Sequence, residues 1–132
     1  MIFTETYAYT CAHHLPTFPD GHKCRLVHGH TCEVTITIQV SNGPTGYAFD
    51  HGELDKCAAA ILAPLDHHLI NDVPGLEDGL AETQLAWLVH RWQIHAFQLG
   101  GRLVECHLDE WSSGGTFRLV KHRKSWPDRS TA

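Results

Sequence analysis

Polar and apolar residues alternate without interruption over residues 33–40, which is the period of a strand with one buried face. Shorter alternations over residues 104–108 and 116–120 flank a glycine pair and predict two further strands, joined as an antiparallel hairpin. A first strand is expected over residues 2–9. The chain therefore carries four predicted strands, two near each end.

Two segments between these strand pairs repeat their apolar residues at the spacing of a helix. One covers residues 51–62 with Asp50 as its N-cap, and the other covers residues 80–99 and ends at a glycine pair. Residues 64–79 between them contain prolines and glycines and predict a long ordered loop, a kind of segment that often carries function. The order ββααββ predicts an α+β domain with two helices packed on one face of a four-stranded antiparallel sheet.

The chain has 132 residues, of which 42% are hydrophobic, so it has the size of one domain with its own core. We expect the domain to cover residues 1–122 and a polar C-terminal tail to cover residues 123–132. No apolar run approaches the roughly 20 residues of a membrane span. The N-terminus also lacks the pattern of a secretion signal, so a cytoplasmic location is the default.

Charge and cysteine content narrow the class of function. The net charge of -5 argues against a nucleic-acid partner, because a duplex binder needs a basic face that displaces counterions. The five cysteines are an odd number and form no C-x-x-C pair, so they are expected to be reduced thiols.

Histidine is the outstanding residue type, with twelve spread along the chain. In His28-Gly29-His30 the two imidazoles point to the same side of a strand, since side chains alternate between its faces. His13, at the end of the first strand, would lie beside them if the first two strands pair antiparallel. Three histidines with a fourth position left open are the ligand set of a catalytic zinc site. An isolated H-x-H pair is more often formed by surface or core histidines, so this assignment depends on its surroundings.

Two cysteines offer a competing ligand set. Cys11 and Cys32 each lie two residues from a proposed ligand, and thiolate binds zinc well, so a closed structural Cys/His site is an alternative. We prefer the interpretation that both are small, buried, apolar residues.

Cys24 has a different environment, in a loop between Lys23 and Arg25 and close to His22. Cationic neighbours and a nearby metal favour thiolate over thiol, and a thiolate can act as a base or nucleophile at neutral pH. The alternative is an incidental loop cysteine.

Asp66-His67, in the long loop, has the composition of a proton relay, because an aspartate that orients an imidazole stabilises the imidazolium formed during proton transfer. Neighbours in sequence rarely make that bond directly. Asp66 could instead bond His67 through the loop geometry, or His67 could cap a helix end.

Glu110 is expected to share a strand face with Val104, Cys106 and Leu108, which places a carboxylate on an otherwise apolar side. A buried carboxylate needs partners, and a heterocycle with an N–H and amino edge would supply them. Otherwise Glu110 ends the strand in solvent.

The ordered set of these motifs resembles the 6-pyruvoyl-tetrahydropterin synthase superfamily over about residues 7–118. The residues that carry the resemblance are Cys11-Ala12-His13, Cys24-x-x-x-His28-Gly29-His30, Leu65-Asp66-His67-His68 and Glu110. Three residues separate Cys24 from His28, as in the bacterial 6-carboxy-tetrahydropterin synthases of the queuosine pathway. A further branch has glutamate in place of this cysteine and makes a folate precursor, and Cys24 argues against it.

The resemblance implies the tunnelling fold, in which ββααββ subunits join their sheets into a barrel. It implies a homo-oligomer, a trimer or a hexamer built from two trimers, with active sites between subunits. It also implies zinc as the metal and 7,8-dihydroneopterin triphosphate as the substrate. By position, it assigns zinc binding to His13, His28 and His30, the base to Cys24, the proton relay to Asp66 and His67, and the pterin anchor to Glu110.

The implied enzyme is a lyase that makes 6-carboxy-5,6,7,8-tetrahydropterin and releases triphosphate and acetaldehyde, for queuosine or another deazapurine. One alternative is a 6-pyruvoyl-tetrahydropterin synthase, which keeps the side chain. The other is a zinc-binding pterin module without catalysis.

One departure from the family concerns the pterin pocket. Residues 79–81 are Gly-Leu-Ala, where the family has Pro-Thr before the helix glutamate, so a hydroxyl that helps to hold the pterin is missing. The glutamate itself, Glu82, is kept as a substrate-binding candidate. Lys23 and Arg25 are candidates for the triphosphate, whereas the basic residues 121–124 are interpreted as solvated surface charge.

Overall fold

The computed structural model describes residues 1–41, 46–47, 49–112 and 115–122. The expected tail over residues 123–132 and the first glycine of the hairpin turn lie outside these residues. The elements are, in chain order, β1 (Ile2–His13), the 3-10 turn η1 (Lys23–Arg25), β2 (His28–Val40), α1 (His51–Leu62), the 3-10 turn η2 (Ile70–Asp72), α2 (Ala81–Gln98), β3 (Gly101–Ser112) and β4 (Gly115–His122). This order confirms the predicted ββααββ arrangement.

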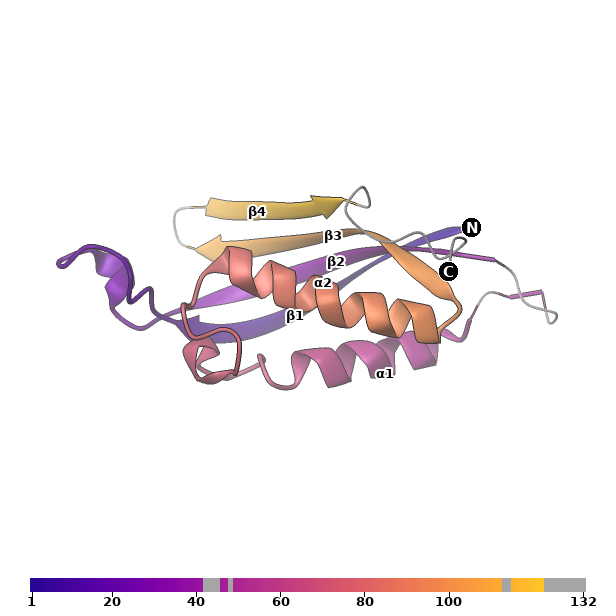
Figure 1. The fold of residues 1–132 in the computed structure, drawn as a ribbon, viewed down its shortest axis with the longest axis horizontal. Coiled ribbons are helices and arrows are strands. Elements are labelled where there is room, and N and C mark those ends of the chain that lie inside the picture. Colours follow the sequence, from indigo (N-terminus) through magenta and orange to yellow (C-terminus); the bar gives the residue numbers. More distant parts are fainter. Residues whose placement is uncertain (42–45, 48, 113–114, 123–132) are drawn as a thin grey trace.

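The four strands form one antiparallel sheet in the order β1-β2-β3-β4, which is also their order along the chain. Both helices lie on the same face of the sheet and run along its length (Figure 1). The predicted α+β class, with two helices on one face of a four-stranded antiparallel sheet, is therefore confirmed.

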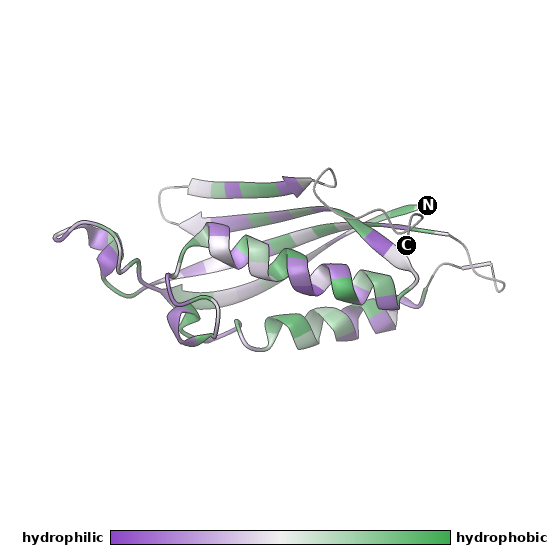
Figure 2. Cartoon of the chain, in the orientation of Figure 1, coloured by the Kyte–Doolittle hydropathy of each residue, from purple (hydrophilic) through white to green (hydrophobic). Residues whose placement is uncertain are grey.

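The core lies between the helices and the alternating apolar row of β2. Val34 and Ile36 of this row are 0% and 1% exposed. The other face of the sheet is polar, and there the hydroxyls of Thr6 and Thr35 lie 2.8 Å apart across β1 and β2. Figure 2 shows the apolar and polar residues alternating along the strands and forming stripes on the helices.

β3 departs from the expected alternation at one residue. The pairing with β2 passes from Thr37 opposite Glu105 to Ile38 opposite Leu103, so Val104 is the extra residue of a β-bulge. The prediction that Val104 shares the buried face is therefore wrong, because the bulge turns its side chain away. The β3 residues that do lie on that face near the bulge are Leu103, Cys106 and Leu108.

Both N-terminal strands are longer than predicted. β1 continues past the expected end at residue 9 to His13, and β2 begins at His28 instead of residue 33. The added residues pair with each other, ending with His13 opposite His28. The first two strands therefore carry their hydrogen-bonded ladder as far as the histidines.

The segment between α1 and α2 is ordered, as predicted for residues 64–79. Its apolar side chains Ile70 and Leu76 are both 0% exposed and belong to the core. Leu69 also forms a parallel bridge to Ala12 of β1, so the segment lies along the outer edge of the sheet. This packing holds the end of α1 and the start of α2 close to the end of β1.

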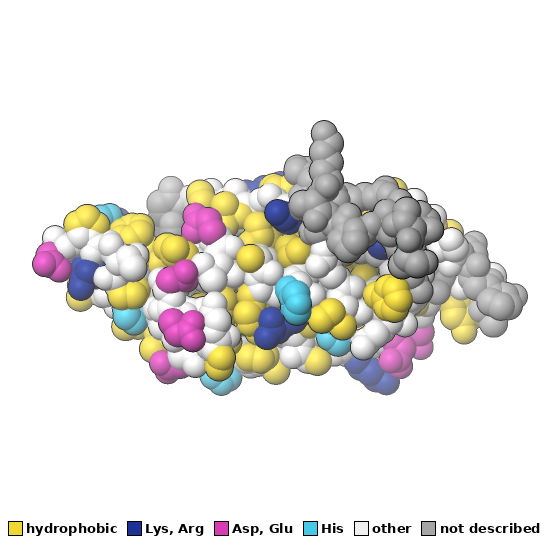
Figure 3. Space-filling model, viewed as in Figure 1, with side chains coloured by type: hydrophobic (Ala, Val, Ile, Leu, Met, Phe, Trp, Pro, Cys, Tyr) yellow, Lys and Arg dark blue, Asp and Glu magenta, His cyan; other side chains and the backbone are white. Residues whose placement is uncertain are grey.

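The helix-covered face carries charges of both signs (Figure 3). Lys and Arg side chains are scattered singly over its described part, whereas acidic side chains gather over the segment between α1 and α2. Within the described ranges, neither α-helix has the length and apolar content needed to cross a bilayer.

Candidate metal centre

Three histidine rings meet where β1 ends and β2 begins. His13 and His28 are opposite each other in the ladder, and His30 shares their face because it lies two residues further along β2. The ring centroids are 4.5 Å apart for His13 and His28, and 4.9 Å apart for the two pairs with His30. One ligand nitrogen from each ring lies within 4.8 Å of the other two.

The backbone fixes the tautomer of every ring in this group. Each Nδ1 is hydrogen-bonded to a main-chain carbonyl: His13 to Gly79 at 2.7 Å, His28 to Leu26 at 2.7 Å, and His30 to Trp111 at 3.0 Å. A carbonyl oxygen only accepts, so each Nδ1 carries a proton, which leaves Nε2 as the nitrogen that can bind a metal. This is the arrangement by which proteins orient metal-binding imidazoles.

His13 shows that the group fits a metal. Its side chain is 3% exposed, and its buried Nε2 has no hydrogen-bond partner among the described residues. Burial lowers the pKa of His13, although its bond to the Gly79 carbonyl and the nearby Glu110 act in the opposite direction. A neutral, buried imidazole without a partner is costly unless something accepts its lone pair, and zinc does so.

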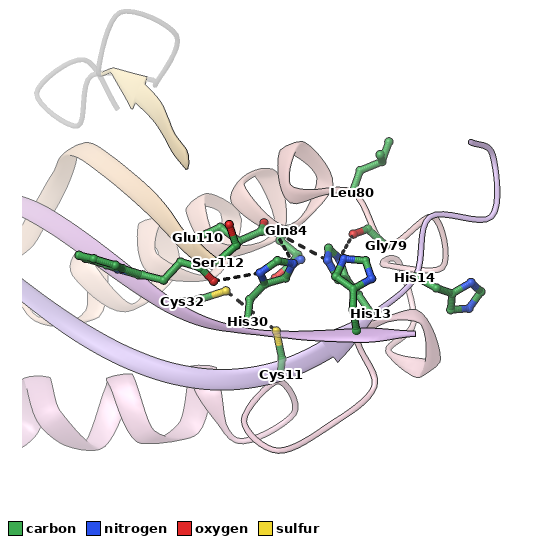
Figure 4. A network of polar contacts seen from close by, with 12 residues as sticks. Cys11, His13, His14, His30, Cys32, Gly79, Leu80, Gln84, Glu110 and Ser112 are labelled. Atoms are coloured by element: carbon green, nitrogen blue, oxygen red, sulfur yellow. Dashed lines mark hydrogen bonds and ion pairs between the residues drawn. The ribbon is translucent and has the colours of Figure 1, made fainter. Parts of the chain in front are cut away.

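Glu110 adds a carboxylate to the same group. Its Oε1 lies 2.9 Å from Nε2 of His30 and 3.6 Å from Nε2 of His13 (Figure 4). The side chain is 13% exposed, so the prediction that Glu110 lies on the buried face holds and the alternative of a strand end in solvent is wrong. His14, the next residue after His13, points away from the group.

The histidines and Glu110 line a cavity of about 710 Å³. Lys23 and Cys24 of η1 form part of its wall, together with Leu26 and Val27 from the segment that leads into β2. Leu26 and Val27 are 72% and 63% exposed, and the sequence interpretation missed them. The signal was present, because two apolar residues stand between a basic turn and the histidine pair.

Backbone and side-chain bonds hold Cys24 at the edge of this cavity. Its N–H donates to Nδ1 of His22 at 3.0 Å, and its carbonyl accepts from the N–H of Leu15 at 2.8 Å. The cysteine is half-buried. The loop is therefore built to present this thiol on the same side as the histidines.

Arg25 has partners within the loop and does not line the cavity. Its Nη1 donates to the carbonyls of Pro16 at 2.7 Å and Phe18 at 2.6 Å, and Nη2 lies 3.7 Å from Asp20. These bonds close residues 16–25 into a compact turn, so the donors expected to bind phosphate are used by the protein.

Replacing Arg25 with glutamine tests whether its guanidinium group stabilises the loop or binds phosphate. We expect the free energy of unfolding, from urea titration, to fall by about 1–2 kcal/mol because two carbonyls lose a charged donor. The Michaelis constant for a triphosphate substrate should stay within about threefold, since that interaction is expected to come from Lys23. A large rise in the Michaelis constant without loss of stability would instead identify Arg25 as a phosphate ligand.

Asp66 and His67 lie at the outer edge of β1, away from the cavity of their own chain. Oδ1 of Asp66 accepts from the N–H of Thr10 at 3.0 Å and lies 3.0 Å from Nδ1 of His67. The bond to Thr10, followed by that to His67, lowers the pKa of Asp66. The two neighbours bond through the loop geometry, which was one of the two alternatives, and His67 has a positive φ of 59°. Its side chain is 80% exposed.

Cys11 and Cys32 are buried at 5% and 1% exposure, as predicted for small apolar residues, and their sulfurs are 4.0 Å apart. Hydrogen bonding with Cys11, and then burial, raises the pKa of Cys32, so it stays a thiol. All five cysteines are free. Neither Cys11 nor Cys32 belongs to the group that could hold a metal, so the geometry favours the open histidine set over the closed Cys/His alternative.

The start of α2 differs from the sequence interpretation. Glu82 is exposed in the first turn and does not line the cavity. Gln84 is instead buried at 1% exposure and accepts a hydrogen bond from the Tyr9 hydroxyl at 3.0 Å. Burial raises the pKa of Tyr9, which keeps this donor protonated. Gln84 could have been found from its place between Leu80 and Leu88, since a polar residue on that helix face must be buried.

Known proteins with similar sequences and structures point to one family. A family model described as 6-pyruvoyl tetrahydropterin synthase matches residues 2–112. The 6-carboxy-5,6,7,8-tetrahydropterin synthase of Synechocystis sp. is 29% identical over 93 residues, which cover 66% of this chain and 70% of that protein. The structure of 6-pyruvoyl tetrahydropterin synthase from Caenorhabditis elegans matches with a TM-score of 0.70 and 17% identity, covering 92% of this chain and 95% of the other. The Plasmodium falciparum enzyme of the same name matches with a TM-score of 0.60 and 13% identity, covering 92% and 98%.

The two structures share the four-stranded sheet and paired helices of this chain, which is the tunnelling fold expected from the sequence. The sequence match extends from β1 through the end of β3 and includes the three histidines, Cys24 and Glu110. The chain belongs to the 6-pyruvoyl tetrahydropterin synthase family.

Proposed function

We propose that the protein is a zinc-dependent 6-carboxy-5,6,7,8-tetrahydropterin synthase. It would convert 7,8-dihydroneopterin triphosphate and one water to 6-carboxytetrahydropterin, triphosphate and acetaldehyde, and supply queuosine or another deazapurine. The observation that carries this proposal is the cavity lined by Cys24 and by three histidines that could hold a metal ion. The similarity to the Synechocystis relative supports the choice of product.

His13, His28 and His30 would hold the zinc ion, whose chemistry is that of a Lewis acid toward the oxygens of the substrate side chain. Glu110 would accept hydrogen bonds from the N–H and amino edge of the pterin, since its carboxylate lies beside His30 and the residue lines the cavity. Lys23 would contact the triphosphate, because this residue lines the cavity and carries a positive charge.

Cys24 would act as the base and take a proton from a side-chain carbon of the bound substrate. A second group has to return protons on the opposite side, and the Asp66-His67 pair has the composition for it. That pair is exposed at the outer edge of β1 and does not line the cavity of its own chain. We therefore propose a homo-oligomer, built from trimers and most simply a hexamer, in which His67 reaches the cavity of a neighbouring subunit. A cytoplasmic location fits the five free thiols.

A second candidate is a 6-pyruvoyl tetrahydropterin synthase, favoured by the structural match to the Caenorhabditis elegans enzyme. A third is a zinc-binding pterin module without catalysis, favoured by the Gly-Leu-Ala sequence at residues 79–81. All three share the fold and the histidine group, so products have to distinguish them.

Product analysis separates these candidates. The zinc-loaded protein is incubated with 7,8-dihydroneopterin triphosphate, and the pterins and acetaldehyde are measured by mass spectrometry. We expect 6-carboxytetrahydropterin and acetaldehyde in equal amounts. A 6-pyruvoyl product without acetaldehyde would establish the second candidate, and one zinc ion per chain without turnover would establish the third.

A further inference from the structure

The three histidines of the metal group differ in how their orienting carbonyls are held. Leu26, the partner of His28, is only two residues away in the chain. Trp111, the partner of His30, is held by the register between β2 and β3, where it lies opposite Thr31. Gly79, the partner of His13, belongs to the segment before α2 and to neither strand. The Gly79 carbonyl therefore needs another means of support.

Asn71 supplies that support. This residue lies in η2, and its side-chain amide makes three hydrogen bonds to main-chain groups. Oδ1 accepts from the N–H of His14 at 3.0 Å, while Nδ2 donates to the carbonyl of His14 at 2.9 Å and to that of Glu77 at 3.0 Å. The amide thus joins the end of β1, next to His13, to the segment that carries Gly79.

Gly79 packs directly against this joint. A Cβ on Gly79 would lie 2.2 Å from the carbonyl oxygen of His14 and 2.8 Å from Nδ2 of Asn71, so its backbone is in contact with both. On its other side, Oδ1 of Asp78 accepts from the N–H of Leu80 at 2.9 Å. The Gly79 carbonyl is held between these contacts and points at Nδ1 of His13 (Figure 4).

We propose that Asn71 is a positioning residue for the metal centre, which fixes the Gly79 carbonyl and through it the orientation of His13. This inference rests on the zinc-binding part of the proposed function. Asn71 does not belong to the histidine group and does not line the cavity. Its effect on zinc would be transmitted through the Gly79 carbonyl. Mutation of groups that orient metal ligands typically changes metal affinity by about 10- to 100-fold.

The test compares Asn71→Asp with wild type and with a destabilised control. Aspartate keeps the acceptor for His14 N–H but places oxygen against the carbonyls of His14 and Glu77, where the amide donated. We expect the zinc dissociation constant, measured by competition with a chromophoric chelator, to rise by about 10- to 100-fold. The absorption spectrum of the Co²⁺-loaded protein should also change, since it reports the number and geometry of the ligands. Far-UV circular dichroism should show that the variant is folded.

Val73→Ala is the matched control. Val73 lies in the same segment, is 8% exposed and has no bond to the Asn71 amide. This variant should lose thermal stability and keep the wild-type zinc affinity and Co²⁺ spectrum.

Two results would overturn the inference: wild-type zinc affinity in both Asn71→Asp and Asn71→Ala, or an equal loss of affinity in Val73→Ala. Zinc binding in the wild type without turnover would contradict the proposed catalysis and leave the role of Asn71 intact. Absence of zinc from the wild type would overturn both.

Discussion

Replacing Cys24 with alanine is expected to lower turnover of 7,8-dihydroneopterin triphosphate by about 10²- to 10⁴-fold, the usual loss when a general base is removed. Zinc should stay at one ion per chain, because the group that could hold a metal consists of histidines alone. The measurements are steady-state turnover and metal content of the same preparation. The Michaelis constant should change little, since the thiol acts on the reacting atoms and contributes little to ground-state binding.

Cys57→Ala is the control for this experiment. Cys57 is a partly buried free thiol of α1 and does not line the cavity, so its loss should leave turnover intact. If Cys24→Ala loses its zinc, the cysteine is a metal ligand. If it keeps full turnover, another group is the base.

Replacing Gly79 with alanine is expected to destabilise the fold and the metal centre together. Gly79 has a φ of +70°, which costs a non-glycine residue about 1–2 kcal/mol. The added Cβ would also lie 2.2 Å from the carbonyl oxygen of His14, and crowding of this kind costs about 1–3 kcal/mol more. We expect the free energy of unfolding to fall by roughly 2–5 kcal/mol in a urea titration, with weakened zinc binding because the carbonyl that orients His13 must move.

Gly100→Ala is the control that separates the backbone cost from the cost of crowding. Gly100 has a similar φ of +86°, but a Cβ there would meet nothing within 4 Å. Its replacement should show the backbone cost alone, about 1–2 kcal/mol, and leave zinc in place. An equal loss of unfolding free energy in the two variants would mean that the segment before α2 accommodates the added methyl group at little cost. Gly79 would then not support the metal centre.

Much of the fold could be predicted from residue patterns. Uninterrupted alternation identified β2, helical spacing identified α1 and α2, and the turn residues between them identified the connecting segment. The ends of β1 and β2 were not assigned by alternation, because residues 10–13 and 28–32 have no regular exchange of polar and apolar side chains. The bulge at Val104 was missed for a different reason, since Val104, Cys106 and Leu108 alternate in the sequence and only the adjacent Leu103 shows the shift in phase.

The candidate site was predicted only as far as side-chain type reveals chemistry. The period of two placed His28 and His30 together, whereas His13 depended on the order of motifs in the family. The carbonyls that orient the rings could not be predicted, because every residue has one. Arg25 illustrates the same limit: its charge suggested phosphate, but the local fold directs its donors to backbone oxygens.

Residue 79 shows that one departure from the family can have two effects. From the sequence, Gly-Leu in place of Pro-Thr meant a lost hydroxyl at the pterin. The structure adds a backbone effect, since proline is restricted to a φ near −65° and cannot adopt the +70° of Gly79. The segment before α2 therefore follows a path here that a proline would forbid, and the bond to His13 depends on it.

The order in which the chain is synthesised separates two of the histidines from the groups that orient them. All three candidate ligands lie in the first 30 residues, but Gly79 follows His13 by 66 residues and Trp111 follows His30 by 81. Contacts between such distant residues form late, after the intervening chain has closed. A nascent chain on the ribosome thus exposes His13 and His30 before their tautomers are fixed, whereas the partner of His28 is only two residues away. Selective loading with metal is therefore expected to follow folding of the whole domain.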